Sequence, residues 1–185
     1  PANYLDLRAL TASLDMVAAA EPWSVDWIGP EGPERFQATL VTDDAFPIQG
    51  VRALVGRPFL PEEFESGRDN VVLLSEVFWR NRFGADTSLV GRQLVLDSIP
   101  RTVVGVMPEA ALAPYGAEVF LPKVFRGDEA VDRASAYWTV MARIAPGVTL
   151  EQARAEMERI ATGLAEQHPA TNRNIGVRVD PLHER

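Results

Sequence analysis

The chain has 185 residues, and its 18 basic and 26 acidic side chains give a formal net charge of −8. This length suits one domain or two small lobes, and a hydrophobic content of 46% is sufficient to form a buried core. The acidic balance argues against nucleic-acid binding, because neutralising phosphate groups requires a basic surface. Since the chain contains no cysteine, disulfides, thiol nucleophiles and thiolate metal sites are excluded.

The sequence shows neither a membrane anchor nor a targeting segment. No apolar run approaches the ~20 residues that a transmembrane helix needs, and no signal-peptide pattern is present. Because the chain begins at Pro1 and not at methionine, we interpret it as a piece excised from a longer protein.

The N-terminal part predicts one helix followed by two strands. Apolar residues recur every three or four positions across residues 3–20, with Asn3 as the expected N-cap and Pro22 as the stop. Residues 23–28 and 36–42 then have strand character, and the second of these alternates apolar with polar side chains.

The middle of the chain has short strands separated by glycines. A strand at 71–74 precedes a helix that Ser75 caps and Gly84 ends. A turn that closes at Gly91 leads to a predicted hairpin, which joins 94–96 to 102–107 around Asp97-Ser98. A short strand at 118–121 ends at Pro122.

The C-terminal part predicts a charged connector at 126–135, a strand at 137–144 and a long amphipathic helix. Pro146-Gly147 forms the turn before this helix, Thr149 and Gln152 form its capping box, and His168-Pro169 ends it. A final strand is expected at 175–179. Strands and helices mix without regular alternation, which indicates an α+β fold.

Few residues point to catalysis. Neither a phosphate-binding loop nor a G-x-S-x-G elbow occurs, so Ser75 is best explained as a helix cap and not as a nucleophile. The acidic residues Glu62, Glu63 and Glu65 lack the apolar surroundings that would raise a carboxyl pKa. His168 and His183 show no metal-ligand spacing. A Schiff-base mechanism would have one candidate, Lys123, the only lysine. We therefore predict no enzyme activity, no cofactor and no metal.

Several ordered motifs carry a family resemblance. Those in the first half are Gly56-Arg57-Pro58-Phe59, Val72 to Ser75, Phe78 to Gly84 and Ser88 to Arg92. Those in the second half are Thr102 to Pro108, Phe120 to Pro122 and Ala142 to Ala153. Each motif is weak alone, but in this order over residues 36–182 they resemble MacB-type periplasmic core domains. The chain is most similar to FtsX-like permeases of bacterial ABC transporters, of the kind common in acidobacteria.

The resemblance implies an architecture and a location. A discontinuous porter-like α/β lobe, expected at 1–56 and 135–185, carries an inserted small mixed α/β lobe, called the sabre, expected at 57–134. The family's segment usually opens with a strand upstream of Asn3, which this chain would lack. The domain would lie on the periplasmic side of the inner membrane, between two membrane helices of the permease.

We expect the family's signature residues to be structural. Glycines at helix ends and turns often need positive φ, and an aromatic pair four residues apart can anchor a small lobe. The set comprises Gly56, Arg57, Phe59, Ser75, Trp79, Phe83, Gly84, Gly91, Gly105, Pro108, Pro122, Arg143, Pro146 and Gly147. The chain departs from the family pattern at Gln49, where leucine is usual, at Ser98, where glycine is usual, and in the loop 109–114, which lacks a common phenylalanine.

Three functions are compatible with these observations. The first is a non-catalytic module that couples ATP hydrolysis to substrate efflux. It would transmit the conformational change that a cytoplasmic ATPase drives. Its partners would be the permease's own membrane helices, the ATPase indirectly, and a second permease copy or a periplasmic protein. The second is a ligand- or peptide-binding receptor module that uses an apolar loop with Leu112 and Tyr115 as partner contacts. The third is a hydrolase that uses Ser75 or the Glu62–Glu65 cluster.

Overall fold

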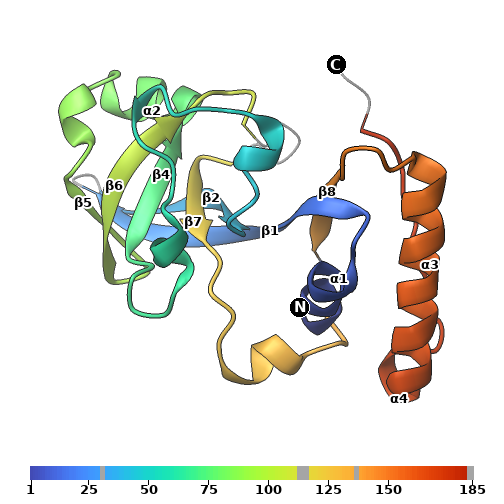
Figure 1. Cartoon of the computed structure of the whole chain (residues 1–185). Helices are drawn as coiled ribbons and strands as arrows, with labels where there is room; N and C mark the ends of the chain where they lie inside the picture. The colour runs from blue at the N-terminus through green and yellow to red at the C-terminus, as the bar shows by residue number, and fades with distance from the viewer. Residues whose placement is uncertain (30–31, 112–116, 136–137, 183–185) are drawn as a thin grey trace. The chain divides into compact units, whose positions relative to one another are not determined.

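A computed structural model describes residues 1–29, 32–111, 117–135 and 138–182. It has a mixed α/β fold with a large mixed sheet and few helices, as the sequence predicted (Figure 1). The chain divides into two compact units, one formed by Pro1–Val17, Phe125–Tyr137 and Ala142–Arg185, the other by Ala18–Val124 and Trp138–Met141. We call these unit 1 and unit 2. No helix among the described residues is both long enough and apolar enough to cross a membrane.

Unit 2 is built around a sheet whose strand order returns on itself. The order is β2-β7-β4-β6-β5-β1, β1 pairs with β2 again, and β3 pairs with β6. The strands are β1 (Leu14–Gly29), β2 (Gly32–Val41), β3 (Val55–Gly56), β4 (Val71–Ser75), β5 (Gln93–Leu96), β6 (Ile99–Met107) and β7 (Val119–Pro122). One apolar cluster includes Val25, Phe36, Val72 and Val106, and a second includes Val41, Leu73 and Phe120. Since neighbouring residues of β4 belong to different clusters, both faces of this strand are buried.

Short helical segments connect the strands of unit 2. They are α2 (Glu76–Phe83) and the 3-10 turns η1 (Pro47–Gln49), η2 (Pro61–Phe64) and η3 (Thr87–Leu89). The predicted hairpin is confirmed, because Leu96 pairs with Ile99, and Asp97 and Ser98 form the turn with φ values of 53° and 64°. Positive φ at both central residues is what a two-residue type I′ hairpin turn requires.

Unit 1 contains the helices α1 (Ala2–Leu10), α3 (Leu150–Gln167) and α4 (Pro169–Asn172), the 3-10 segment η5 (Gly127–Val131) and part of the strand β8 (Thr139–Ile144). The predicted capping box of α3 is confirmed: Thr149 Oγ1 accepts from Gln152 N, and Gln152 Oε1 accepts from Thr149 N. The buried face of α3, with Met157, Ile160 and Leu164, packs with Leu7 and Leu14.

The prediction of one helix over residues 3–20 is wrong. Helix α1 ends at Leu10, and residues from Leu14 onward form β1, in which Ala20 pairs with Val41. The residues Ala18, Ala19 and Ala20 have no exposed surface. Although alanine favours helices, tertiary structure overrides that preference, because Ala18 is buried in one apolar cluster with Val41 of β2 and β1 pairs with β2 from Ala20 onward.

The strand expected at 175–179 is not formed, since those residues have no regular secondary structure. The carbonyl of Val179 instead accepts hydrogen bonds from the Arg154 guanidinium on α3. A strand needs a neighbour that satisfies its backbone groups, and an alternating sequence alone does not supply one.

The two units also differ from the expected lobes. Residues 18–56 belong to the same compact unit as 57–124, because β1 and β2 form ladder pairs with each other and β2 pairs with β7. The assignment of a porter-like and a sabre-like lobe stays a prediction.

Candidate functional site

The residues suspected of catalysis have structural contacts. Ser75 is nearly buried, and its hydroxyl accepts from Phe78 N at 3.3 Å, which makes it the N-cap of α2 as predicted. Glu63 is buried in an ion pair, whereas Glu62 and Glu65 are exposed. His168 is the C-cap of α3, and His183 lies outside the described residues. Within the described ranges, no group of three or more His, Asp or Glu side chains could hold a metal ion.

The Arg57–Glu63 ion pair organises the first signature motif. Arg57 donates from both terminal nitrogens to the two Glu63 carboxylate oxygens at 2.8 and 2.6 Å, and Leu60 N donates to the same carboxylate at 2.8 Å. Burial opposes ionisation of Glu63, but the Arg57 guanidinium and the Leu60 amide outweigh it and hold the pKa of this carboxyl below its usual range. The bidentate geometry fixes the turn between β3 and η2.

The signature glycines Gly56 and Gly105 are required by a close approach of two backbones. Strand β3 pairs with β6, with Gly56 opposite Gly105. A Cβ atom at Gly56 would lie 2.3 Å from Val104 O, and one at Gly105 would lie 2.5 Å from Arg57 O. Neither position can hold a side chain unless the strands separate, so the glycines determine the β3–β6 contact.

A group of aromatic residues anchors α2. Trp79 is 6% exposed, and its Nε1 donates to Asp86 O at 3.0 Å, so its indole lies in the core of unit 2. The half-buried Phe83 contacts Phe78 edge-on at a ring distance of 5.6 Å. Gly84 ends the helix with a φ of 57°, in the left-handed region that its C-cap position favours.

The remaining signature residues lie at ends of elements or in the core. Phe59 is buried beside Phe46 and Phe64. Gly91 and Gly147 have φ values of 90° and 83°. Pro108 follows β6, Pro122 ends β7, and Pro146 follows β8. These positions are consistent with structural roles. That all the signature residues have such roles stays a prediction.

The only lysine has a buried partner. Lys123 Nζ lies 2.9 Å from Glu21 Oε2, with side chains 8% and 4% exposed, and 4.9 Å from the ring centroid of Trp138. Since the ammonium group has a carboxylate and an aromatic face around it, Lys123 has the contacts of a structural cation.

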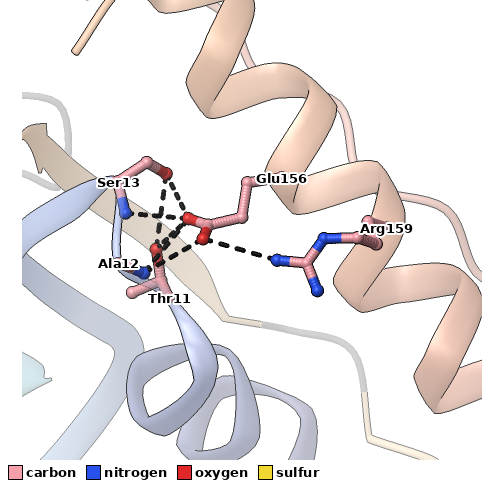
Figure 2. Close-up of polar contacts among 5 residues, drawn as sticks. All are labelled: Thr11, Ala12, Ser13, Glu156 and Arg159. Atoms are coloured by element: carbon pink, nitrogen blue, oxygen red, sulfur yellow. Dashed lines mark hydrogen bonds and ion pairs between the residues drawn. The ribbon is translucent and has the colours of Figure 1, made fainter.

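A carboxylate cluster in unit 1 was not anticipated from the sequence. The Glu156 carboxylate accepts from Thr11 Oγ1 at 2.9 Å, Ser13 N at 2.8 Å, Ala12 N at 3.2 Å and also the Ser13 hydroxyl (Figure 2). We call Thr11, Ala12, Ser13 and Glu156 the Glu156 cluster. The pKa of Glu156 is lowered to about 2, chiefly by the hydrogen bond from the Ser13 hydroxyl. Burial opposes this shift, whereas the Ser13 amide and the Thr11 hydroxyl add to it.

The Glu156 cluster connects α3 to the turn between α1 and β1. Glu156 lies three residues after Ala153 and four before Ile160, on the buried side of the helix. In the sequence, Glu156 is an acidic residue beside the apolar stripe of a helix, and this pattern could have indicated that it has a polar partner elsewhere in the chain. Which residues form that partner depends on tertiary structure.

A second ion pair of unit 1 involves the signature residue Arg143. Its Nε and Nη2 atoms each donate to the Asp15 carboxylate at 2.8 Å. The Arg143 guanidinium lowers the pKa of Asp15 from its ordinary value. This contact joins β8 to the start of β1. The expected partner contacts Leu112 and Tyr115 lie outside the described residues.

Solved structures of other proteins share this fold. The extracellular domain of the noncanonic ABC-type transporter YknZ from Gram-positive bacteria matches with a TM-score of 0.64 at 18% identity, covering 89% of this chain and 83% of that chain. The periplasmic region of MacB from Actinobacillus actinomycetemcomitans matches with a TM-score of 0.64 at 15% identity, covering 91% of this chain and 75% of that chain. A domain described as part of a permease from Porphyromonas gingivalis matches with a TM-score of 0.68 at 13% identity, covering 91% of this chain and 73% of that chain.

The chain belongs to the MacB-like periplasmic core domain family, whose model matches residues 1–160. No curated protein sequence matches it significantly. The family resemblance found in the sequence motifs is therefore confirmed, and the chain is an extracytoplasmic domain of an ABC transporter permease. Such a permease has membrane helices and works with an ATPase.

Proposed function

We propose that this domain is a non-catalytic module that transmits conformational change, driven by cytoplasmic ATP hydrolysis, to the export or extrusion of a substrate. The observation that carries the proposal is that polar and glycine signature residues fix backbone contacts within the units. Gly56 and Gly105 permit the β3–β6 approach, and Arg57 and Arg143 hold carboxylates at 2.6 to 2.8 Å. The partners of the domain are then the permease's membrane helices, the ATPase indirectly, and a second permease copy or a periplasmic protein.

The physical requirement for this function is rigidity within each moving unit. A module that couples ATP hydrolysis to export must have two arrangements with different stabilities in different nucleotide states. If the units deformed internally, displacement at one end would be absorbed before it reached the other. Ion pairs with bidentate geometry and a carboxylate that accepts several hydrogen bonds resist such deformation.

The test uses the full-length permease with its ATPase in lipid vesicles. Glu156→Ala removes the carboxylate that holds α3, and Glu158→Ala makes the same change at an exposed position of that helix. We expect the first variant to change the rate of ATP hydrolysis by the complex and the second to leave it unaltered. Equal rates in both variants, with the first shown to loosen unit 1, would count against transmission through this domain.

A separate measurement addresses catalysis. Ser75→Ala removes the hydroxyl of the predicted nucleophile, and Glu63→Gln removes the charge of the most buried acidic residue among 62–65. We expect any hydrolytic activity of a preparation to survive both substitutions in folded protein. An activity lost in both variants, while thermal unfolding shows an intact fold, would favour the hydrolase instead.

A further inference from the structure

Three side chains meet in a cluster that lies within unit 2. Lys123 Nζ is 2.9 Å from Glu21 Oε2 and 4.9 Å from the ring centroid of Trp138. The side chains of Lys123 and Glu21 are 8% and 4% exposed, and Trp138 is half-buried. Strand β2 positions both charged residues, because Leu40 pairs with Glu21 and Val41 O accepts a hydrogen bond from Lys123 N at 2.8 Å. We call Glu21, Lys123 and Trp138 the Lys123 cluster.

The members of the Lys123 cluster lie close to the points where the chain enters or leaves unit 2. This unit consists of residues 18–124 and 138–141, so the chain enters it at 18 and 138 and leaves it after 124 and 141. Glu21 lies three residues after the first entry, Lys123 one residue before the first exit, and Trp138 at the second entry. Displacements that pass along the chain into unit 2 therefore reach segments that the cluster holds together.

An ion pair covered by an aromatic ring is a contact that opens at low cost. Removing an ammonium and a carboxylate from water costs free energy that their attraction only partly returns, so apolar residues would hold the segments at least as well. When the pair is uncovered, water solvates both charges, whereas uncovering an apolar contact returns nothing. The segment that carries Trp138 has few buried side chains, since Thr139 and Val140 are exposed. Segments of this kind are the ones that open locally while the rest of a domain stays folded.

We infer that the Lys123 cluster is a releasable clasp on the segments through which the chain enters and leaves unit 2. In the closed state, the Trp138 ring covers the ion pair. In the open state, segment 138–141 moves away, and water solvates Lys123 and Glu21 while unit 2 stays folded. The two states differ in free energy, so the nucleotide state of the ATPase can shift their populations. This last step rests on the proposed transmission function, whereas the existence of the two states does not.

The first test uses the fact that Lys123 is the only lysine. Residues 1–185 are acylated with an N-hydroxysuccinimide ester, and peptide mapping by mass spectrometry separates Lys123 from the N-terminus. We expect slow labelling whose rate stays constant within about twofold as urea rises below the unfolding transition, because opening the clasp exposes little surface. No labelling of folded protein, or a rate that rises as steeply with urea as the unfolding of unit 2, would overturn the inference. Lys123 would then be released only by unfolding.

The size of the reagent distinguishes an open clasp from direct attack on the closed cluster. A small and a bulky ester should label Lys123 with the same ratio of rates as a free lysine peptide, because both reach an ammonium group that water already surrounds. Labelling by the small ester alone would show reaction through the narrow exposed surface of a closed cluster and would also overturn the inference.

Two tryptophan variants form a matched pair. Trp138→Ala removes the ring above the Lys123 ammonium and should raise the labelling rate about tenfold. Trp23→Ala makes the same change at a tryptophan of unit 2 that is 50% exposed, and it should leave the rate unaltered. Circular dichroism verifies that both variants are folded. Equal rates in wild type and Trp138→Ala would overturn the inference, as would the same acceleration in both variants.

The last test measures labelling of Lys123 in the full-length permease with its ATPase in lipid vesicles. We expect the rate to differ about threefold or more between the nucleotide-free state and the state held by a non-hydrolysable ATP analogue. Equal rates, in a complex whose ATP hydrolysis responds to Glu156→Ala, would overturn the role of the clasp and leave the proposed transmission function standing. If ATP hydrolysis does not respond to Glu156→Ala either, the proposed function fails, and the labelling of residues 1–185 by itself decides whether the clasp opens.

Discussion

Replacing Glu156 by alanine should destabilise unit 1 and leave unit 2 intact. The substitution removes the acceptor for Thr11 Oγ1 at 2.9 Å, Ser13 N at 2.8 Å and Ala12 N at 3.2 Å, and for the Ser13 hydroxyl. Hydrogen bonds to a charged acceptor contribute about 1.5–3 kcal/mol each when buried. The Glu156 side chain is 15% exposed, so water can reach the released donors. We therefore expect a net loss on the order of 2 kcal/mol, and nothing from the exposed Arg159 contact.

The distribution of tryptophan makes the assay specific for each unit. All the tryptophans of the chain, Trp23, Trp27, Trp79 and Trp138, belong to unit 2, whereas α1 and α3 belong to unit 1. Far-ultraviolet circular dichroism should show the helical transition at a temperature lower by roughly 10 °C in the variant. Tryptophan fluorescence should report an unchanged transition for unit 2.

The pH dependence gives an independent check. Because the folded-state pKa of Glu156 is lowered from 4.5 to about 2, its stabilising contribution is complete above pH 4.5 and is lost as the pH falls through about 2. The difference in unfolding free energy between wild type and Glu156→Ala should be constant near neutrality and shrink below pH 4.5. Glu158→Ala is the control. The reasoning is refuted if Glu156→Ala melts like this control, or if the difference is the same at pH 3 as at pH 7.

Three further substitutions test other contacts by thermal or urea unfolding. Trp79→Ala should cost on the order of 3 kcal/mol, because it removes a buried indole and its hydrogen bond; an unchanged fluorescence transition in unit 2 would contradict the observed burial. Gly105→Ala should destabilise the β3–β6 contact by about 2 kcal/mol or more, since its Cβ would meet Arg57 O at 2.5 Å; wild-type stability would show that the strands can separate. Ser98→Gly should stabilise the hairpin by about 1 kcal/mol, because Ser98 has a φ of 64°; Ser98→Ala is the control and should give no gain.

Helix caps and turns were predictable from the sequence because the residues that form them are neighbours in the chain. Ser75 caps α2 through an amide three residues away, and the Thr149–Gln152 box closes over the same short distance. The hairpin turn at Asp97-Ser98 is likewise decided by neighbouring residues. Such features depend on a few dihedral angles and one or two hydrogen bonds, so the rest of the protein hardly alters them.

Predictions failed where distant partners decide the outcome. Residues 14–20 have helical periodicity but belong to β1, which pairs with β2 from Ala20 onward and also with β8, and Ala18 to Ala20 are fully buried. Residues 175–179 alternate like a strand but have no regular secondary structure, and Val179 O accepts hydrogen bonds from the Arg154 side chain on α3. The partner of Glu156 lies more than 140 residues away in sequence, and no local rule identifies it.

The sequence by itself determined the family, the extracytoplasmic location and the structural character of single motif residues such as Ser75 and Trp79, because motif order and local capping rules are properties of the chain. Only the tertiary structure decided which carboxylate meets which donor. Arg57 with Glu63, Lys123 with Glu21, and Glu156 with Thr11 to Ser13 are matched by the folded backbone. A charged side chain that is removed from water needs a partner, and this need can be read from the sequence. Which residue becomes the partner depends on where the folded backbone places the charge.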